Sequence, residues 1–401
     1  MKKIIFVVID GLGDDQIPEF DFQTPLEFAK TPNLDFLAKN GFCGLVLPWQ
    51  EKGKLPTSED THLALFGYDP KKSNPGRGVL EVLGIGEKIK KDDICFRGNF
   101  ATVDKNLVII DRRAGRIENT LPLIQSLEKI KLKKVKIIIK RAFGHRIGII
   151  LRGKNLSPKV TSNDPKKVGV KVLEVKALNK KAQKTAKILN QFLEIAHAIL
   201  EIHPLNKKRK LKALLPANYL LIRGAGKLKK IQSFKERYNL KAAFIAGGTL
   251  YKGIGRYLKM KEIKVKGATG LVNTNLKGKF LAAKKNIPKF DFIFVHIKAA
   301  DNLAEDGNFK GKKEFLERLD KEIGILKRLN NVQIVITGDH CTSSLNKAHS
   351  QSKVPILIYP GKGEKINKFC EKECKKGALG TIAQLDVLKK VIALAKGQNI
   401  S

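Results

Sequence analysis

Potential metal ligands follow three of the most hydrophobic runs in the sequence. Asp10 follows IIFVVI, Asp301 lies just beyond FDFIFVHI, and VQIVIT is followed by Asp339 and His340. An aspartate beside a glycine is most often part of a turn, so each residue alone is weak evidence. Carboxylate oxygens and imidazole nitrogens are nevertheless common ligands of divalent metals. Together with His349, nine residues beyond His340, these residues predict an Asp/His metal site.

Ser58 lies in the segment PTSEDTHLALFGYDP, which can place a hydroxyl in a loop or at the start of a helix. One interpretation is that Ser58 or Thr57 caps this helix, since acidic residues follow in the next turn. The other interpretation is chemical. A metal ion can hold a serine as its alkoxide, a far better nucleophile, and can neutralise charge on a transferred phosphoryl group. The segment alone favours capping.

Arginine is the minority basic residue, and it clusters in four segments. These are FRGN at 96–99, DRRAGR at 111–116, GHR at 144–146 and IRGAG at 222–226. Phosphoryl transfer needs cations near the phosphoryl oxygens, and a bidentate guanidinium suits them well. We expect an arginine-lined domain that faces a metal-bearing sheet edge, with an anionic substrate in the cleft. Ordinary surface charge is the alternative explanation.

The hydrophobic runs are expected to be strands that are buried on both faces, at 4–9, 290–297, 332–337 and 355–360. Helical patterns lie between or after them, at 31–41, 313–330 and 381–397. Strands that alternate with helices predict an α/β fold with a doubly wound, mostly parallel sheet. The carboxyl edge of such a sheet is where ligands bind, so the candidate ligands would meet there.

The middle of the chain has a different pattern. Strand candidates follow one another closely at 106–111, 133–140, 146–153 and 168–175. An amphipathic helix is expected near 179–203, with an apolar face made of Ile188, Phe192, Ile195, Ile199 and Ile202. The pattern predicts a smaller, sheet-rich inserted domain at 88–209. The core domain would then be discontinuous and consist of 1–87 and 210–401.

Composition restricts the possible partners and the compartment. The chain has 78 Lys and Arg against 38 Asp and Glu, a formal net charge of +40. This would suit a nucleic-acid binder, but we interpret the excess as spread along the whole chain, and no arginine-rich tail, RNP-like aromatic stripe or zinc finger accompanies it. No segment is apolar enough to span a bilayer. Five scattered cysteines without a CxxC pair favour a reducing cytoplasm.

These segments and others resemble, in order and over almost the whole chain, the archaeal-type 2,3-bisphosphoglycerate-independent phosphoglycerate mutases of the alkaline phosphatase superfamily. The resemblance is carried by VVIDGLGD at 7–14, TPNLDFLAKNG at 31–41, TSEDTHLALFGYDP at 57–70, GRGVLEVLGIG at 76–86, RGNFATVD at 97–104, DRRAGRI at 111–117, RGAG at 223–226, HIKAAD at 296–301 and GDH at 338–340. It implies an alkaline-phosphatase-like fold. It also implies interconversion of 2-phosphoglycerate and 3-phosphoglycerate, in glycolysis and gluconeogenesis, through a phosphoserine and without 2,3-bisphosphoglycerate.

The resemblance also implies a role for each site residue. One divalent ion would be held by Asp10, Ser58, Asp339 and His340, and a second by Asp301, Glu305 and His349. Manganese or magnesium is expected, with zinc as a further candidate. Ser58 would be the nucleophile, and the substrate contacts would be Arg112, Arg113, Arg116, Arg223 and Lys298.

Glu305 departs from the family pattern. The family usually has a histidine four residues after the aspartate that corresponds to Asp301. A carboxylate at this position can ligate manganese or magnesium and would favour harder metals than an imidazole does. In the alternative interpretation Glu305 is a solvated loop residue and the second ion binds weakly. The neighbouring Asp306 is another candidate ligand.

Two further functions fit the sequence. A metal-dependent phosphatase, or a mutase of another small phosphate ester, would share the same metal-binding core, because the core does not decide what an inserted domain selects. A basic nucleic-acid-binding protein with a degenerate metal site would account for the net charge. We expect a small phosphorylated substrate as the partner, no membrane contact, and nucleic acid only as the alternative.

Overall fold

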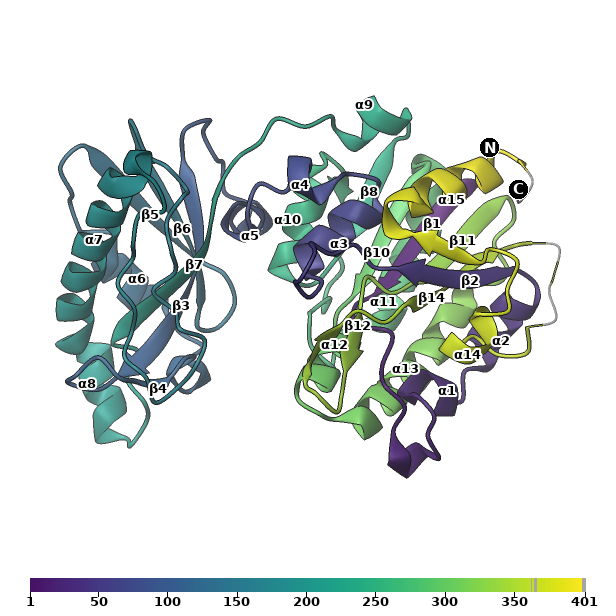
Figure 1. Ribbon diagram of the computed structural model, residues 1–401, viewed down its shortest axis with the longest axis horizontal. Coiled ribbons are helices and arrows are strands. Elements are labelled where there is room, and N and C mark those ends of the chain that lie inside the picture. Colours follow the sequence, from purple (N-terminus) through teal and green to yellow (C-terminus); the bar gives the residue numbers. More distant parts are fainter. Residues whose placement is uncertain (362, 364–365, 399–401) are drawn as a thin grey trace. The chain divides into compact units, whose positions relative to one another are not determined.

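The chain forms two compact units in a computed structural model that describes residues 1–361, 363 and 366–398 (Figure 1). One unit consists of Met1–Asn74 and Ile231–Ser401, and the other of Pro75–Lys230. Each unit has its own sheet and its own hydrophobic core. No helix in the described part of the chain is long and apolar enough to cross a membrane.

The first unit is built on an eight-stranded sheet with the strand order β15-β2-β14-β11-β1-β10-β8-β9. In chain order its strands are β1 (Lys3–Ile9), β2 (Phe42–Leu47), β8 (Ala242–Ile245), β9 (Lys261–Glu262), β10 (Phe292–Ile297), β11 (Val332–Thr337), β14 (Val354–Tyr359) and β15 (Thr381–Ala383). Of these described strands, only β14 runs antiparallel to its neighbours. The predicted mostly parallel sheet is confirmed, and the four predicted runs correspond to β1, β10, β11 and β14.

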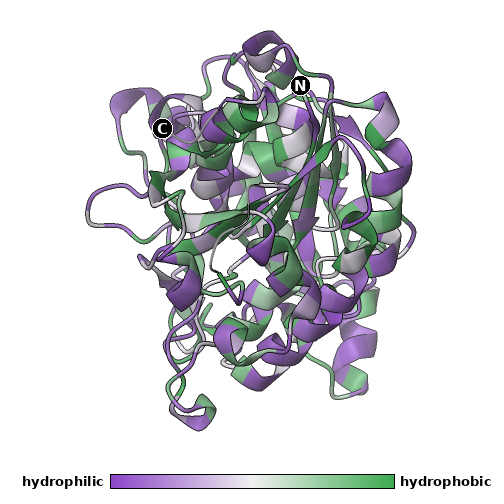
Figure 2. Cartoon of the chain, turned by 90° about the vertical axis from the view of Figure 1, so that its right-hand side faces the viewer, coloured by the Kyte–Doolittle hydropathy of each residue, from purple (hydrophilic) through white to green (hydrophobic). Residues whose placement is uncertain are grey.

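Helices pack on both faces of this sheet, because successive residues of its central strands are hydrophobic on both sides. In Figure 2 these strands are hydrophobic and the outer turns of the helices are hydrophilic. Ile5 and Val7 share a core with residues of α2 (Pro32–Lys39), α11 (Leu276–Asn286) and α13 (Phe309–Ile323). On the opposite face Phe6 packs against Phe66, which follows α3 (Ser58–Leu65). The sheet is therefore doubly wound, as predicted.

The remaining helices of the first unit are short. They are α1 (Pro25–Phe28), α4 (Pro70–Ser73), α9 (Phe234–Tyr238), α10 (Thr249–Tyr257), α12 (Ala299–Glu305), α14 (Glu371–Cys374) and α15 (Val387–Ala395). The helix expected at 381–397 is therefore shorter, since its first residues form β15 beside β2.

The second unit contains a five-stranded antiparallel sheet. Its strands are β3 (Ile94–Val103), β4 (Ile109–Asp111), β5 (Val135–Arg141), β6 (Arg146–Gly153) and β7 (Tyr219–Lys227). Helices α6 (Leu121–Leu127) and α7 (Gln183–Glu201) pack on one face of this sheet, and α5 (Arg77–Ile85) covers the other. A further helix, α8, comprises Pro204–Leu211. Because β7 pairs with β3 and α5 packs on Cys95, this unit extends beyond the expected boundaries of 88 and 209 at both ends.

The strand predicted at 168–175 is wrong. Val168, Val170 and Leu173 are exposed, and Gly169 has a φ of 74°, a left-handed conformation that interrupts an extended strand. The segment makes only one isolated bridge, from Lys171 to Val108. The central positions of the sheet are taken by β3 and β6, and β7 forms an edge beside β3. Neither β3 nor β7 was among the predicted strands.

The predicted amphipathic helix is present as α7, but its buried face differs from the prediction. Ile202 is 68% exposed and lies beyond the end of the helix. The buried stripe consists of Thr185, Ala186, Leu189, Phe192, Leu193, Ala196 and Leu200. The two alanines lie on the packed side, where small side chains allow a helix to approach a sheet closely. The apolar spacing alone therefore gave the helix but misplaced its contact face.

Two lysines of the first unit are completely buried in different environments. Lys312 Nζ contacts Asp14 Oδ2 at 2.8 Å and also donates to the carbonyl of Gly13. Lys279 Nζ donates to the carbonyl of His296 at 2.8 Å and has no carboxylate partner among the described residues. Burial, with a smaller contribution from Lys252, lowers the pKa of Lys279 from 10.5 to about 8.

We expect Lys279→Met to stabilise the protein at pH 7 by about 1 to 3 kcal/mol, because the wild type then buries an uncompensated ammonium. Between pH 8 and pH 10.5 the unfolded lysine binds a proton that the folded one has lost, so wild-type stability rises with pH relative to the variant. The stability advantage of Lys279→Met over the wild type should therefore shrink as the pH rises. Urea unfolding of both proteins at pH 7 and pH 9.5 measures this difference.

Lys312→Met is the matched control. It leaves the Asp14 carboxylate buried without its cation and should destabilise the protein by about 3 kcal/mol at pH 7. A Lys279→Met protein that is less stable than the wild type at both pH values would contradict the assignment of Lys279 as an uncompensated buried charge.

Candidate functional site

The carboxyl ends of three neighbouring strands meet at one edge of the first unit's sheet. Strand β1 lies between β10 and β11, and Val8 is paired with His296 on one side and with Thr337 on the other. Asp10 lies two residues after Val8, and Asp339 lies two residues after Thr337. Both aspartates are fully buried. The register of the parallel strands therefore brings the two carboxylates together, as predicted for this edge.

Asp10, Asp339 and His340 form a first group of potential metal ligands. One ligand atom from each residue lies within 4.8 Å of the others. His340 Nε2 is 3.5 Å from Asp10 Oδ1 and 3.2 Å from Asp339 Oδ2. Asp339 Oδ1 also accepts a hydrogen bond from the backbone N–H of Gly11 at 3.1 Å, which fixes the carboxylate against the loop after β1.

Ser58 is the first residue of α3, and its side chain faces this ligand group. The N-cap is Thr57, whose hydroxyl accepts a hydrogen bond from the backbone N–H of Asp60. The Ser58 hydroxyl is therefore not needed as a cap, and its Oγ lies 3.4 Å from His340 Nε2. Ser58 is only 4% exposed. A helix N-terminus favours negative charge, so this position suits an alkoxide or a phosphorylated serine.

Asp301, His340 and His349 form a second group within the same distance limit. Asp301 lies in the first turn of α12. The hairpin of β12 (Cys341–Ser343) and β13 (Ala348–Ser350) places His349 opposite Thr342, so this loop folds back as expected. His349 Nε2 lies 3.5 Å from Asp301 Oδ1, and the rings of His340 and His349 stack with their centroids 3.8 Å apart.

Glu305 lies at the edge of this second group. It is the last residue of α12, one helical turn after Asp301, and its Oε1 is 3.9 Å from His349 Nε2. Its side chain is 53% exposed, whereas that of Asp301 is completely buried. Neither Glu305 nor the exposed Asp306 belongs to a ligand group found among the described residues. The structure thus brings Glu305 near the site without enclosing it.

Lys298 connects the two groups. Its ammonium donates to Asp10 Oδ1 at 3.3 Å and to Asp301 Oδ2. Burial by itself lowers the pKa of Lys298, but the two carboxylates outweigh this effect and raise it well above the usual value. Lys298, predicted from the resemblance as a substrate contact, is thus held as a cation between the carboxylates.

Two histidines that were not predicted from the sequence support these carboxylates. His62 Nδ1 lies 3.2 Å from Asp339 Oδ2, and His296 Nε2 lies 3.0 Å from Asp10 Oδ2. Burial lowers the pKa of His296 to about 3, so its ring is neutral. The spacing of four residues between Ser58 and His62 could have indicated a shared helix face, and His296 stands at the end of a predicted strand.

Thr342 was also missed, and it links the two groups through its hydroxyl. Its Oγ1 donates to Asp301 Oδ1 at 2.7 Å and lies 3.1 Å from His340 Nδ1. A hydroxyl in this position orients both the carboxylate and the imidazole ring. Partners of this kind hold metal ligands in place.

Three buried carboxylates give the site a high density of negative charge. Burial raises the pKa of Asp10, Asp301 and Asp339. Lys298, beside Asp10 and Asp301, and the His340 ring, beside Asp339, are foremost among the neighbours that reverse this and hold all three pKa values below the usual range. The three side chains are therefore ionised. A donor set of buried carboxylates and imidazoles beside one hydroxyl fits hard or borderline divalent cations.

The second unit has a separate cluster of arginines. Asp164 binds Arg112 through two hydrogen bonds of 3.1 and 2.7 Å and also accepts one of 3.2 Å from Arg223. Arg97 lies opposite Arg223 in the β3–β7 pair. Burial, together with the neighbouring charges of Arg77, Arg223 and Arg146, lowers the pKa of Arg97 to about 9.

The structure thus brings Arg112 and Arg223 together, as their proposed common role requires. It does not do so for Arg113 and Arg116, which are exposed residues at and beside a short 3-10 turn. Arg97, in contrast, belongs to an arginine-rich segment of the sequence but was not assigned to the site. Its convergence with Arg223 arises from strand pairing and has no local signal.

Comparison with known proteins gives a consistent result. A family model described as 2,3-bisphosphoglycerate-independent phosphoglycerate mutase matches residues 38–206. The chain is 43% identical to the protein of that name from Methanococcus aeolicus, over 100% of this chain and 96% of the relative. It is 42% identical to 2,3-bisphosphoglycerate-independent phosphoglycerate mutase 1 of Methanocaldococcus jannaschii, over 99% and 98% of the two chains.

Two solved structures share the fold over nearly their whole length. The PH0037 protein from Pyrococcus horikoshii is 32% identical with a TM-score of 0.83, and the match covers 99% of this chain and 98% of that one. The cofactor-independent phosphoglycerate mutase from Thermoplasma acidophilum is also 32% identical, with a TM-score of 0.69 and a coverage of 98% and 100%.

Proposed function

Because the chain belongs to the family of 2,3-bisphosphoglycerate-independent phosphoglycerate mutases, we propose that the site around Ser58 interconverts 2-phosphoglycerate and 3-phosphoglycerate through a phosphoserine. Enzymes of this family are isomerases that transfer a phosphoryl group within one molecule. The observation that supports the assignment of the site is the buried Ser58 hydroxyl, placed at a helix N-terminus beside His340.

The residues of the site fit two divalent metal ions. Asp10, Ser58, Asp339 and His340 would hold one ion, and Asp301, Glu305 and His349 the other. When bound, the ions would lower the pKa of the serine hydroxyl and neutralise charge on the phosphoryl oxygens. Manganese and magnesium suit the carboxylate-rich donor set best, and zinc is the further candidate.

In the proposed reaction, Ser58 Oγ forms a bond to phosphorus while the bond from phosphorus to the substrate oxygen breaks. The serine proton ends on the released glycerate. The other glycerate hydroxyl then attacks the phosphoserine and returns its own proton to Ser58, so no water is consumed. His62, His296 and Thr342 keep the carboxylates and the His340 ring oriented during both steps. Lys298 compensates part of the negative charge.

A direct assay tests the function. The purified protein is incubated with Mn²⁺ and 3-phosphoglycerate in the absence of 2,3-bisphosphoglycerate, and 2-phosphoglycerate and free phosphate are both measured. Formation of 2-phosphoglycerate without phosphate release is the expected result. Release of phosphate instead would identify a phosphatase. If neither 2-phosphoglycerate nor phosphate forms, the result would contradict a catalytic role for the site. Removal of metal with a chelator should abolish turnover, and added Mn²⁺ should restore it.

Arg112 and Arg223 are proposed to bind the anionic substrate. We expect Arg112→Ala and Arg223→Ala each to lower kcat/KM by about 10² to 10³-fold, because each removes a cation that stabilises charge on the substrate and in the transition state. Steady-state kinetics with 3-phosphoglycerate measure this effect.

The matched control is Arg152→Ala. Arg152 belongs to the same unit and is also bound by two hydrogen bonds to a buried aspartate, Asp93. Its loss should affect stability but leave kcat/KM within about threefold of the wild type. Wild-type kinetics in both the Arg112 and Arg223 variants would rule out their role in substrate binding.

We also place the enzyme in the cytoplasm as part of this proposal. All five cysteines are free and buried in the structure, in accordance with a protein that does not depend on disulfides.

A further inference from the structure

The positive charge of the chain is concentrated in its second unit. Pro75–Lys230 carry 37 Lys and Arg against 12 Asp and Glu, a formal net charge of +25. The larger first unit carries 41 against 26, a net charge of +15. Both units thus carry an excess of positive charge, as expected, but the excess is larger in the second unit. The proposed mutase reaction does not require a charge of this size.

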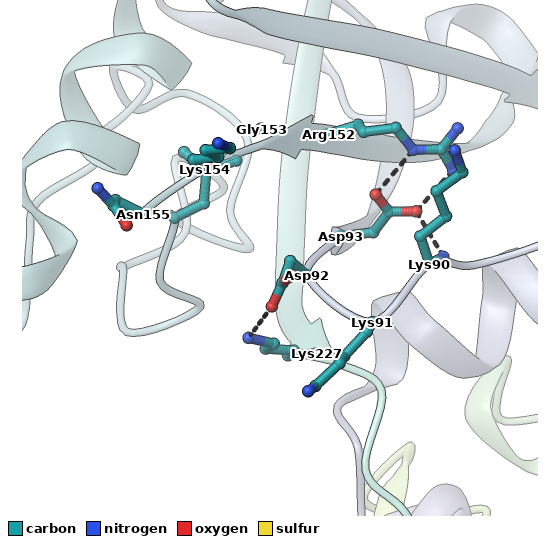
Figure 3. A pocket seen from close by; sticks show the side chains of 10 residues that line it. Lys90, Lys91, Asp92, Asp93, Arg152, Gly153, Lys154, Asn155 and Lys227 are labelled. Atoms are coloured by element: carbon teal, nitrogen blue, oxygen red, sulfur yellow. Dashed lines mark hydrogen bonds and ion pairs between the residues drawn. The ribbon is translucent and has the colours of Figure 1, made fainter.

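A groove of about 790 Å³ in the second unit gathers several of these cations (Figure 3). It is lined by the loop between α5 and β3, the end of β6 with the residues that follow it, and the last residue of β7. The cationic side chains in it are Lys90, Lys91, Arg152, Lys154 and Lys227. Among the described residues, Asp92 and Asp93 are the only acidic ones that line it.

Three of the five cations are available for a ligand. Arg152 is bound to Asp93 at 2.9 and 2.7 Å, and Lys227 to Asp92 at 3.0 Å (Figure 3). Lys90, Lys91 and Lys154 are exposed, and their ammonium groups have no hydrogen bond or ion pair within the described part of the chain. The groove therefore carries an uncompensated charge of about three.

The groove is distinct from the arginine cluster of the same unit. Arg77 is the first residue of α5, whereas the groove begins at Lys90, five residues beyond the last residue of that helix. The exposed Lys136 is paired with Arg152 across β5 and β6, and Lys184 donates to the carbonyl of Lys154. Both lysines therefore lie beside residues of the groove and add to its positive charge.

The chemistry of the lining favours a particular polyanion. Lysine is a compact point charge that suits a single phosphate oxygen, in contrast to the bidentate arginines of the other cluster. No aromatic side chain of the described residues lines the groove, so unpaired bases would find nothing on which to stack. The backbone of a nucleic-acid duplex presents regularly spaced phosphates and needs no stacking surface. The further excess of cations outside the groove suits a ligand that is longer than the groove.

We propose that the groove around Lys90, Lys91 and Lys154 binds the phosphate backbone of duplex nucleic acid without sequence preference. This activity is separate from the mutase reaction and uses none of the residues assigned to it. The metal ligands belong to the other unit of the chain, and the arginines Arg112 and Arg223 do not line the groove.

The test uses the full-length protein and a fluorescently labelled duplex of about 20 base pairs, with anisotropy measured over a series of KCl concentrations. The variant Lys90→Glu/Lys91→Glu/Lys154→Glu should bind at least tenfold more weakly at low salt. The slope of log K against log salt should decrease in magnitude by about 2 to 3, since each phosphate contact contributes roughly 0.9. Two duplexes of unrelated sequence should give equal affinities for the wild type.

Two control variants carry the same change in charge. The first control replaces lysines on and just after α8 of the same unit and is Lys207→Glu/Lys208→Glu/Lys212→Glu. The second replaces lysines of the first unit and is Lys264→Glu/Lys277→Glu/Lys285→Glu. All six lysines are exposed. Both controls should lose less than threefold in affinity. Mutase turnover, which should be unchanged in the groove variant, reports that the fold is intact.

Three results would overturn the proposal. The first is an absence of duplex binding by the wild type at 50 mM KCl. The second is an α8 variant that binds as weakly as the groove variant, which would attribute binding to net charge alone. The third is displacement of the duplex by polyglutamate of equal charge as effectively as by unlabelled duplex, which would indicate an acidic protein as the partner.

Discussion

Ser58→Ala is expected to abolish isomerisation, with a loss in kcat of about 10⁴-fold or more, while the fold remains intact. The expectation rests on the absence of a substitute hydroxyl in the same helical turn. The Thr57 hydroxyl donates to Asp60 Oδ2 at 2.8 Å and caps the helix. The Thr61 hydroxyl lies 3.0 Å from the carbonyl of Thr57 and 3.2 Å from Asp339 Oδ2, so it already supports that carboxylate. Neither is positioned like Ser58 Oγ, 3.4 Å from His340 Nε2.

Two measurements check this prediction. Coupled-enzyme kinetics give the turnover, and intact-protein mass spectrometry after rapid quenching detects the phosphoryl group, which should appear on the wild type and be absent from Ser58→Ala. Thr57→Ala is the matched control one residue away. Loss of the cap should cost about 1 kcal/mol of stability but preserve both the phosphoryl group and most of the turnover. A Ser58→Ala enzyme with near-wild-type rates would exclude Ser58 as the nucleophile.

Glu305→Ala is expected to reduce bound metal from two ions per chain toward one and to depress turnover by at least tenfold. Glu305 lies one helical turn after Asp301, and its carboxylate is 3.9 Å from His349 Nε2, so a small adjustment would complete a second set of ligands. Because Glu305 is exposed, its substitution should not disturb the core. Glu305→His should keep the second ion but shift its preference from manganese or magnesium toward softer metals.

Metal analysis of the purified proteins, together with activity in Mn²⁺, Mg²⁺ and Zn²⁺, measures both effects. Asp306→Ala is the control, since Asp306 is also acidic, exposed and adjacent in sequence. It should leave stoichiometry and turnover unchanged. If Asp306→Ala loses the ion instead, Asp306 is the ligand. Unchanged stoichiometry and rate in Glu305→Ala would show that Glu305 is a solvated residue.

Part of the site could be predicted because its residues follow local signals. Hydrophobic runs predict buried strands, and in a parallel sheet the ends of such strands meet at one edge. These two rules are enough to place Asp10 and Asp339 at the same edge, where strand pairing brings them together. His62 and His296 had weaker signals of the same kind. Thr342 had none, because its contact with Asp301 depends on the hairpin of β12 and β13.

The second unit was less predictable, because its contacts join residues far apart in the chain. Arg97 and Arg223 meet only through the pairing of β3 with β7, and no short segment records that pairing. The buried face of α7 was misplaced for a related reason. The spacing of Ile188 and Phe192 identifies an amphipathic helix, but the side that packs is set by the surface it meets.

Hydrophobic periodicity and residue type are local properties. They were therefore enough to predict the class of fold, the doubly wound sheet and the kinds of side chain available for metal-assisted phosphoryl transfer. The three-dimensional arrangement was needed to show that Ser58 Oγ lies beside His340, that Lys298 lies between Asp10 and Asp301, and that Arg97 lies opposite Arg223. These features depend on distances between segments that strand register and packing alone establish.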